Sequence, residues 1–326
     1  MSFHQRHTPL ALASGRGAFF LSLAWALTAA TASGAQGGFQ LDLPLECTLG
    51  ETCFIQQYVD ADPGPGAADF TGGPLAYDGH RGTDFRVADL EALAAGVPIL
   101  APAPGVIRGI RDEMPDRLLE DRRDVEGREC GNGVAIDHGD GWETQLCHLA
   151  LGSITVQTGQ TVEAGDVVGE MGLSGATQFP HVHISVRKDG AVLDPFVEDL
   201  WQERPDYEPG GLLSVGFSDA VPSFDAVKAG TADAAELPRL SNALVVWASL
   251  FGGQAGDEVT LQIFDPTGAQ IFDHVAVLER TQAQLFRAAG RRTPPTGWRP
   301  GTYRGQAQLI RDGQILDTLE TRLPIR

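Results

Sequence analysis

Apolar and polar residues alternate with a period of two along much of the chain, and glycine interrupts the alternation at short intervals. The tetrapeptide His-Gly-Asp-Gly at 138–141 is typical of a hairpin turn between two such runs. Short strands at this spacing predict an antiparallel, sheet-dominated domain over residues 79–204. Its strands are expected at 97–101, 105–110, 133–137, 142–149, 159–165, 166–169 and 181–186.

A second run of alternating residues follows the Pro-, Asp- and Gly-rich stretch 205–212, which is typical of a linker. A chain of 326 residues is long enough for two domains. We interpret residues 213–326 as a C-terminal β-sandwich-like domain of the immunoglobulin-like kind. It contains one histidine, His274, and no cysteine, so we expect His274 to be structural and the domain to have no catalytic role.

Two other segments lack a strand pattern. Residues 36–78 are rich in Gly, Pro and Asp, and we expect them to form an extended lead-in with little regular structure. Residues 112–129 form a charged, non-periodic run, which predicts a surface loop with one helical turn. An insertion of this length near a site would shape access to it, although a loop that is simply solvated is the plainer interpretation.

Residues 1–35 are predicted to be a secretory signal peptide. Arg6 and Arg16 precede an apolar run, residues 18–31, which is followed by the small residues Ser33-Gly-Ala35. This run of about 14 residues falls short of the roughly 20 that a membrane anchor needs. Cleavage after Ala35 would leave Gln36 first, where a lipid anchor requires cysteine. We therefore expect export to the periplasm or the extracellular space, without a membrane anchor after cleavage.

Acidic residues exceed basic residues along the chain, 43 to 24, which gives a formal net charge of −19. Loss of the two signal-peptide arginines would bring the mature chain to −19 − 2 = −21. Nucleic acid and anionic membranes would repel such a protein, so neither is expected as a partner. The charge itself suits a soluble exported protein.

The four cysteines all lie beyond the predicted signal peptide, and export makes disulfides their expected state. Four cysteines allow three pairings. Cys47 with Cys53 would close a short loop, and Cys130 with Cys147 would join the strands of the predicted hairpin. The alternative, a cysteine-rich metal site, is disfavoured because no CxxC spacing occurs.

The strongest chemical signal is a set of histidines and one aspartate. His181 and His183 lie two residues apart in a predicted strand, so they share one face, while aliphatic residues occupy the other. His80 and Asp84 converge on one point if Gly82 starts a strand. Two imidazoles and a carboxylate suit zinc, which in hydrolases keeps a fourth position open for water. The chain has no HExxH, which excludes the helix-borne zinc site of thermolysin-like enzymes.

Five segments follow one another in order over residues 79–196, roughly a third of the chain: HRGTD, APAPGVI, GNGVAIDHGDGWETQLCHL, PHVHISV and DPF. In this combination they resemble the LytM or lysostaphin-type M23 metallopeptidases. HxxxD and HxH are each weak motifs alone, and their order with CHL and the IDHG segment makes the resemblance specific.

The resemblance implies a LytM-type antiparallel fold and one zinc ion per chain, held by His80, Asp84 and His183. It also implies that His148 and His181 lie beside the metal as catalytic residues. One of the two would take a proton from the zinc-activated water, and either could stabilise the oxyanion. The sequence leaves open which histidine does which.

The chain departs from the family pattern at two places. Leu146 stands where an aromatic residue is usual, two positions before His148, and residues 112–129 lengthen a loop near the cleft. Both concern substrate preference rather than metal binding. His138 matches a family position but is interpreted here as a turn residue.

The leading hypothesis is an exported zinc metalloendopeptidase that hydrolyses peptide bonds in peptidoglycan cross-links or stem peptides. An alternative is a non-catalytic LytM-like protein that binds the cell wall or activates an amidase. Such relatives typically lose one of the five residues, and this chain keeps all five. In a third interpretation the metal site is only structural, and the C-terminal domain, through which a protein partner could bind, is the functional part.

Overall fold

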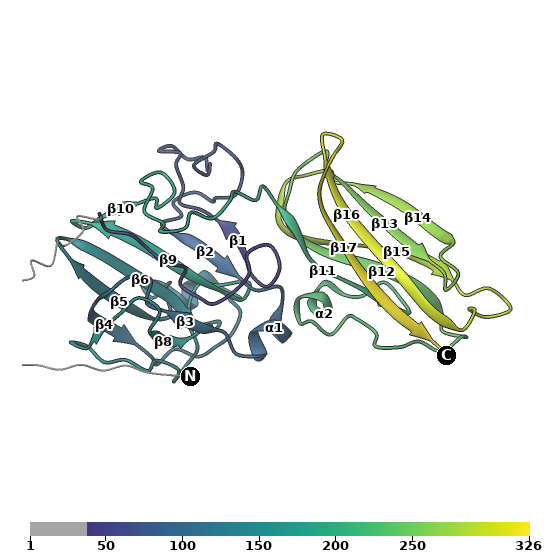
Figure 1. Cartoon of the computed structure of the whole chain (residues 1–326), viewed down its shortest axis with the longest axis horizontal. Coiled ribbons are helices and arrows are strands. Elements are labelled where there is room, and N and C mark those ends of the chain that lie inside the picture. The colour runs from purple at the N-terminus through teal and green to yellow at the C-terminus, as the bar shows by residue number, and fades with distance from the viewer. Residues whose placement is uncertain (1–37) are drawn as a thin grey trace, which may run out of the picture. The chain divides into compact units, whose positions relative to one another are not determined.

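The computed structural model describes residues 38–326, which fold mainly as antiparallel β-sheets (Figure 1). This confirms the predicted mainly-β fold class. The predicted signal peptide lies outside the described residues. Across residues 38–326, no helix has the length and apolarity needed to cross a membrane.

The strands before residue 200 belong to an eight-stranded sheet and a two-stranded sheet, accompanied by two very short helices. The elements are β1 (Phe54–Gln57), β2 (Thr83–Arg86), α1 (Leu90–Ala94), β3 (Pro98–Leu100), β4 (Gly105–Arg111), the 3₁₀ helix η1 (Arg122–Val125), β5 (Asn132–Gly139), β6 (Trp142–Leu149), β7 (Thr161–Val162), β8 (Val167–Glu170), β9 (His181–Lys188) and β10 (Ala191–Leu193).

The larger sheet has the order β1-β2-β9-β6-β5-β4-β7, with β10 paired to β9 (Figure 1). Each of these strand pairs is antiparallel. In β9 the side chains of Val182, Ile184 and Val186 are buried in the core, as the alternation predicted. Because a one-residue slip would turn these side chains out of the core, their burial fixes the register of β9 against β2 and β6.

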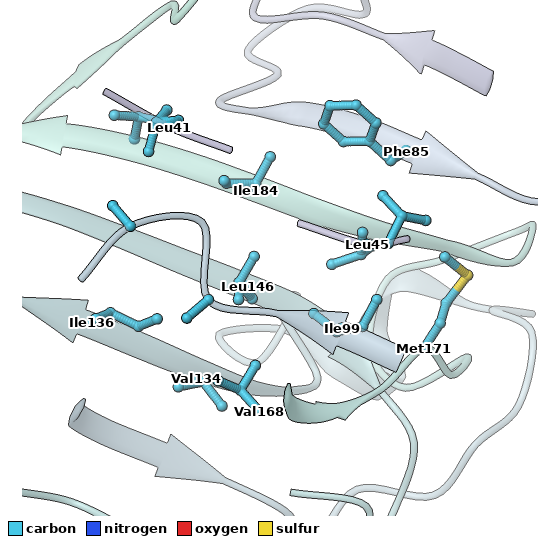
Figure 2. Close-up of a cluster of buried hydrophobic side chains, with 14 of the residues drawn as sticks. Leu41, Leu45, Phe85, Ile99, Val134, Ile136, Leu146, Val168, Met171 and Ile184 are labelled. Carbon is cyan, nitrogen blue, oxygen red and sulfur yellow. The ribbon is translucent and has the colours of Figure 1, made fainter. Parts of the chain in front are cut away.

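The core of this region is aliphatic and includes residues outside the regular strands (Figure 2). Leu41, Leu45, Tyr58 and Leu75 come from the segment expected to be an extended lead-in, and each is at most 2% exposed. The segment is mostly irregular, as expected, but it supplies β1 to the sheet and apolar anchors to the core. Isolated apolar residues in a Gly- and Pro-rich background gave no periodic signal.

The insertion forms a loop between β4 and β5 that contains the single 3₁₀ turn η1. Asp121 caps this turn, because its carboxylate accepts a hydrogen bond from the Arg123 backbone N–H. The loop with one helical turn that the sequence predicted is therefore present.

The remaining strands form a three-stranded sheet, β11-β12-β15, and a four-stranded sheet, β14-β13-β16-β17. Side chains from both sheets share one hydrophobic core, which is the arrangement of a β-sandwich. The immunoglobulin-like assignment and the domain boundaries stay predictions. The elements are β11 (Gly211–Ser218), α2 (Phe224–Lys228), β12 (Ala243–Gly253), β13 (Glu258–Phe264), β14 (Gln270–Val277), β15 (Gln282–Arg292), β16 (Gly301–Arg311) and β17 (Gln314–Ile325).

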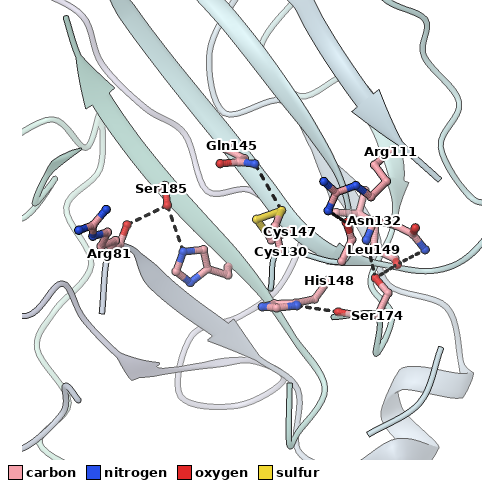
Figure 3. Close-up of a disulfide and its surroundings, with 12 residues drawn as sticks. Arg81, Arg111, Cys130, Asn132, Gln145, Cys147, His148, Leu149, Ser174 and Ser185 are labelled. Carbon is pink, nitrogen blue, oxygen red and sulfur yellow. Dashed lines mark hydrogen bonds between the residues drawn. A yellow bond between two sulfur atoms is a disulfide. The ribbon is translucent and has the colours of Figure 1, made fainter. Parts of the chain in front are cut away.

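Two disulfides are present, Cys47–Cys53 and Cys130–Cys147. The second joins the residue two positions before β5 to a residue of β6, at the end of the hairpin (Figure 3). Next to it, the Asn132 backbone N–H donates to the Ser174 hydroxyl, which in turn donates to the Leu149 carbonyl. The covalent bond and these hydrogen bonds hold the end of β6 in place.

Replacing both Cys130 and Cys147 by serine is expected to lower the free energy of unfolding by about 3 kcal/mol, because the crosslink restricts the unfolded chain. Urea denaturation monitored by tryptophan fluorescence measures the change. The matched control replaces Cys47 and Cys53, which lie 6 residues apart rather than 17 and should cost less. A larger loss in the control would contradict this account of the crosslink.

Candidate metal centre

Three side chains predicted to bind a metal meet where β2 pairs with β9. Asp84 stands directly opposite His183 in the register of these strands, and His80 lies in the loop before β2. His80 Nε2 lies 3.2 Å from Asp84 Oδ1 and 3.1 Å from His183 Nδ1, and the last two atoms are 2.7 Å apart. Residues about 100 positions apart in the sequence therefore present three ligand atoms to one point.

The spacing of these atoms fits a zinc ion. Four ligands at about 2.0–2.1 Å in a tetrahedron lie roughly 3.3 Å from one another. Two of the observed separations, 3.1 and 3.2 Å, are close to this value, and the third, 2.7 Å, is shorter. Among the described residues, this is the one group of three or more His, Cys, Asp or Glu side chains with metal-ligand spacing.

The far side of each ligand imidazole is held by a hydrogen bond. His80 Nδ1–H donates to the Tyr58 carbonyl at 2.6 Å. His183 Nε2–H donates to the Ser185 hydroxyl at 3.1 Å, and that hydroxyl donates to the Arg81 carbonyl at 2.8 Å (Figure 3). These bonds fix the tautomers, so that His80 Nε2 and His183 Nδ1 keep their lone pairs for a metal.

Gly82, just before β2, allows His183 to lie this close to the backbone. A Cβ atom at this position would lie 2.5 Å from His183 Nε2 and 2.5 Å from the Ile184 carbonyl oxygen. Both contacts are too short for any real side chain. Only glycine therefore fits between His80 and Asp84 at this position.

His148 and His181 lie beside the three ligand atoms, with their ring centroids 4.6 Å apart. Each donates its Nδ1–H to a backbone carbonyl, His148 to Ser174 at 2.7 Å and His181 to Phe179 at 2.9 Å. Their Nε2 atoms are thereby left as acceptors, and His181 Nε2 lies 3.6 Å from Asp84 Oδ1. The five residues selected from the sequence come together.

The backbone of His148 has a left-handed conformation, with φ of 66°. For a histidine this conformation is uncommon and costs energy. Two hydrogen bonds offset that cost: His148 N–H donates to the Cys130 carbonyl at 2.8 Å, and Gly172 N–H donates to the His148 carbonyl at 2.9 Å. The strain aims the imidazole toward the ligand group from the end of β6.

Burial and neighbouring charges shift the pKa values of the Asp84 carboxyl and of imidazoles around it. Although burial alone would raise it, the pKa of the Asp84 carboxyl is held well below its usual range by His80 and His181. Burial opposes the charged form of His80, but the Asp84 carboxylate raises the pKa of this imidazole. Burial, followed by neighbouring imidazoles, lowers the pKa of His148 well below its usual value. Burial likewise lowers the pKa of His181, so both rings are neutral near pH 7.

A cavity of about 370 Å³ opens over the site, lined among others by Asp84, His148 and His181. Leu119, Glu120 and Arg122 of the insertion form part of its wall. The insertion thus borders the cavity while remaining at the surface.

The other two histidines of residues 38–326 lie outside this group. His138 lies in β5 rather than in the turn predicted for it, and it bonds to the Pro104 carbonyl and the Thr144 hydroxyl, each at 2.8 Å. His274 is exposed on β14, next to Phe272.

Sequence reasoning missed one side chain at the site. Tyr77 packs its ring against His80, with centroids 4.4 Å apart, and lines the cavity. It is a single tyrosine in a loop, outside any motif, so no signal distinguished it. Ser185 was placed on the correct face by the alternation, but its bond to His183 could not be foreseen.

The sheet and the arrangement of two histidines beside a His-Asp-His group define a metallopeptidase-type domain. Residues 78–195 match the model of peptidase family M23. This segment of the chain is an M23 peptidase domain, as the resemblance indicated.

Among characterised proteins, the chain is 31% identical over 118 residues to the DD-carboxypeptidase/endopeptidase Mpg of Neisseria meningitidis, covering 36% of this chain and 22% of Mpg. It is 31% identical over 104 residues to the peptidoglycan DD-endopeptidase ShyA of Vibrio cholerae, covering 32% and 19%. Both alignments span about a fifth of the relative. A solved M23 catalytic domain of EnpA from Enterococcus faecalis aligns with 49% of this chain and 96% of its own, at 23% identity and a TM-score of 0.33.

Replacing Ser185 by alanine is expected to weaken zinc binding 10- to 100-fold, because the His183 Nε2–H loses the acceptor that fixes its tautomer. Competition with a chromogenic chelator measures the affinity. The control is Ser218→Ala in β11, whose hydroxyl bonds to the Ala220 carbonyl. Equal zinc affinity of the Ser185 variant and wild type would remove this serine from the site.

Proposed function

We propose that the protein is an exported zinc metalloendopeptidase that cleaves peptide bonds in peptidoglycan cross-links or stem peptides. The observation that carries the proposal is the spacing of three ligand atoms, 2.7–3.2 Å apart, next to two buried imidazoles. The M23 match to residues 78–195 supports the same chemistry.

His80, Asp84 and His183 would hold one zinc ion per chain through Nε2, Oδ1 and Nδ1. When bound, zinc supplies Lewis acidity, which lowers the pKa of a water and polarises the scissile carbonyl. Their outer hydrogen bonds keep the two imidazoles oriented for this role. The low pKa of Asp84 keeps its carboxylate charged under all ordinary conditions.

His148 and His181 supply the proton transfers. In its neutral form, one Nε2 accepts the proton of the attacking water as the new C–O bond forms. The imidazolium then returns a proton to the amide nitrogen as the C–N bond breaks. The other histidine is also neutral near pH 7, so its Nε2 donates a hydrogen bond to the oxyanion only after it has taken up a proton from solvent. The Nδ1–H bonds to Ser174 and Phe179 keep both rings facing the substrate.

The peptidoglycan substrate is supported by the relatives, since Mpg and ShyA are a DD-carboxypeptidase/endopeptidase and a peptidoglycan DD-endopeptidase. Export is supported by the signal-peptide pattern of residues 1–35. The two disulfides agree with an oxidising compartment, either the periplasm or the extracellular space. The net charge of −19 disfavours nucleic acid and anionic membranes as partners.

The alternative of a non-catalytic wall-binding protein or amidase activator needs no proton-transfer groups. Here both imidazoles are buried, neutral and aimed at the ligand group, which favours catalysis. A protein partner of the C-terminal sandwich is compatible with either function.

His148→Ala and His181→Ala are each expected to lower the rate of cleavage of purified sacculi by 10²- to 10⁴-fold, because each removes a proton-transfer or oxyanion group. Mass spectrometry of the released muropeptides measures the rate and identifies the bond cut. Zinc content should stay at one ion per chain in both variants, which separates loss of chemistry from loss of metal.

His138→Ala is the matched control, since this histidine bonds only to Pro104 and Thr144. It should cleave sacculi at the wild-type rate. If wild type and both catalytic variants release the same products at the same rate, the proposed roles of His148 and His181 are wrong.

Removal of metal by 1,10-phenanthroline is expected to abolish cleavage, and one equivalent of zinc should restore it. In Asp84→Ala, the loss of a ligand should leave cleavage absent even with added zinc. Full activity of the chelated protein, with no zinc detected by elemental analysis, would exclude a metallopeptidase mechanism.

A further inference from the structure

The insertion between β4 and β5 places one positive charge at the wall of the cavity. Arg122, in the turn η1, lines the same cavity as Asp84, His148 and His181. Among the residues that line it, Arg122 is the only lysine or arginine. A fixed cation is therefore close to the place where a substrate would be cut.

Arg122 has no acidic partner among the described residues, although the chain carries 43 acidic and 24 basic side chains. Its neighbours are paired: Arg123 with Asp121, and Arg117 with Asp124 at 3.5 Å. Glu120 also lines the cavity, but within residues 38–326 no carboxylate oxygen lies within 4.0 Å of the Arg122 guanidinium. In such an acidic chain, a free guanidinium at the cleft is available for an anion from outside.

Arg122 shares the cavity wall with a residue that contacts a candidate metal ligand. Tyr77 lines the same cavity, and its ring packs against His80. A group bound by Arg122 would therefore lie within a few residues of the scissile bond. The planar guanidinium offers a fork of N–H donors that matches the two oxygens of a carboxylate.

We propose that Arg122 binds a free carboxylate of the substrate peptide next to the scissile bond, and so determines which peptides are cleaved. This inference rests on the proposed peptidase function and specifies its substrate class. The carboxylate has two possible sources, the C-terminal carboxylate of a peptide or the side-chain carboxylate of a diacid residue. Both offer the same chemistry to the guanidinium.

The test compares three synthetic peptides with the same scissile bond: one with both carboxylates free, one amidated at the C-terminus and one amidated at the side chain. Zinc-loaded full-length wild type should have a kcat/KM about 10-fold higher for peptides that keep the recognised carboxylate, as expected for a hydrogen bond between charged groups. If amidation of the C-terminus lowers kcat/KM, Arg122 recognises the C-terminal carboxylate; if amidation of the side chain lowers it, Arg122 recognises the side-chain carboxylate.

Arg122→Ala should lower kcat/KM about 10-fold for the preferred peptide and leave the amidated one nearly unchanged. Arg122→Lys should lie between, since it keeps the charge but loses the fork. The control is Arg123→Ala, because Arg123 lies in the same turn, is 86% exposed and does not line the cavity. It should behave as wild type.

If Arg122→Ala lowers kcat/KM equally for free and amidated peptides, or does not lower it at all, Arg122 does not have the proposed role. The peptidase function would still stand. If zinc-loaded wild type cleaves no peptide and no sacculi, the proposed function fails instead. Calorimetric binding of the uncleaved peptides then decides the inference separately. If amidation weakens peptide binding by the same small factor in wild type and in Arg122→Ala, the proposed role of Arg122 is refuted.

Discussion

The pairing of β2 with β9 is the constraint on which the site depends. It places Asp84 opposite His183, while Phe85, Val182 and Ile184 face the core on the other side of the same strands. A slip of one residue would exchange these faces and bury the carboxylate in an aliphatic core at prohibitive cost. The hydrophobic alternation that builds the core therefore also aims the ligands, and folding and site assembly are one event.

Loops rather than strands then orient the four imidazoles. Their outer N–H groups end, directly or through Ser185, on the backbone carbonyls of Tyr58, Arg81, Ser174 and Phe179. Carbonyls in irregular segments are suited to this because neighbouring strands do not use them all. The lead-in consequently does more than cover the sheet, since Tyr58 anchors the core with its side chain and His80 with its carbonyl.

The strands present most of the site side chains and the loops orient them, and this difference explains which features the sequence could predict. The candidate site residues could be selected from the sequence because their chemistry is residue-specific and the strand period of two assigns their faces, as for His181 and His183. The backbone carbonyls that accept hydrogen bonds from the imidazoles could not be predicted, because every residue carries a carbonyl. Only the fold determines that those of Tyr58 and Ser174 lie next to a histidine. The packing of Leu41 and Leu45 was hidden for a similar reason, because single apolar residues without a period give no pattern.

The insertion shows a further limit of composition as a signal. Its charged, non-periodic residues correctly indicated solvent exposure, but exposure does not say which part of the surface a loop covers. Because β4 and β5 belong to the sheet that carries the site, a loop between them reaches the cavity without entering the core. Side chains there change at little cost to stability. In this acidic protein, Arg122 at that position puts one positive charge at the wall of the cleft, whereas the chain as a whole repels anions.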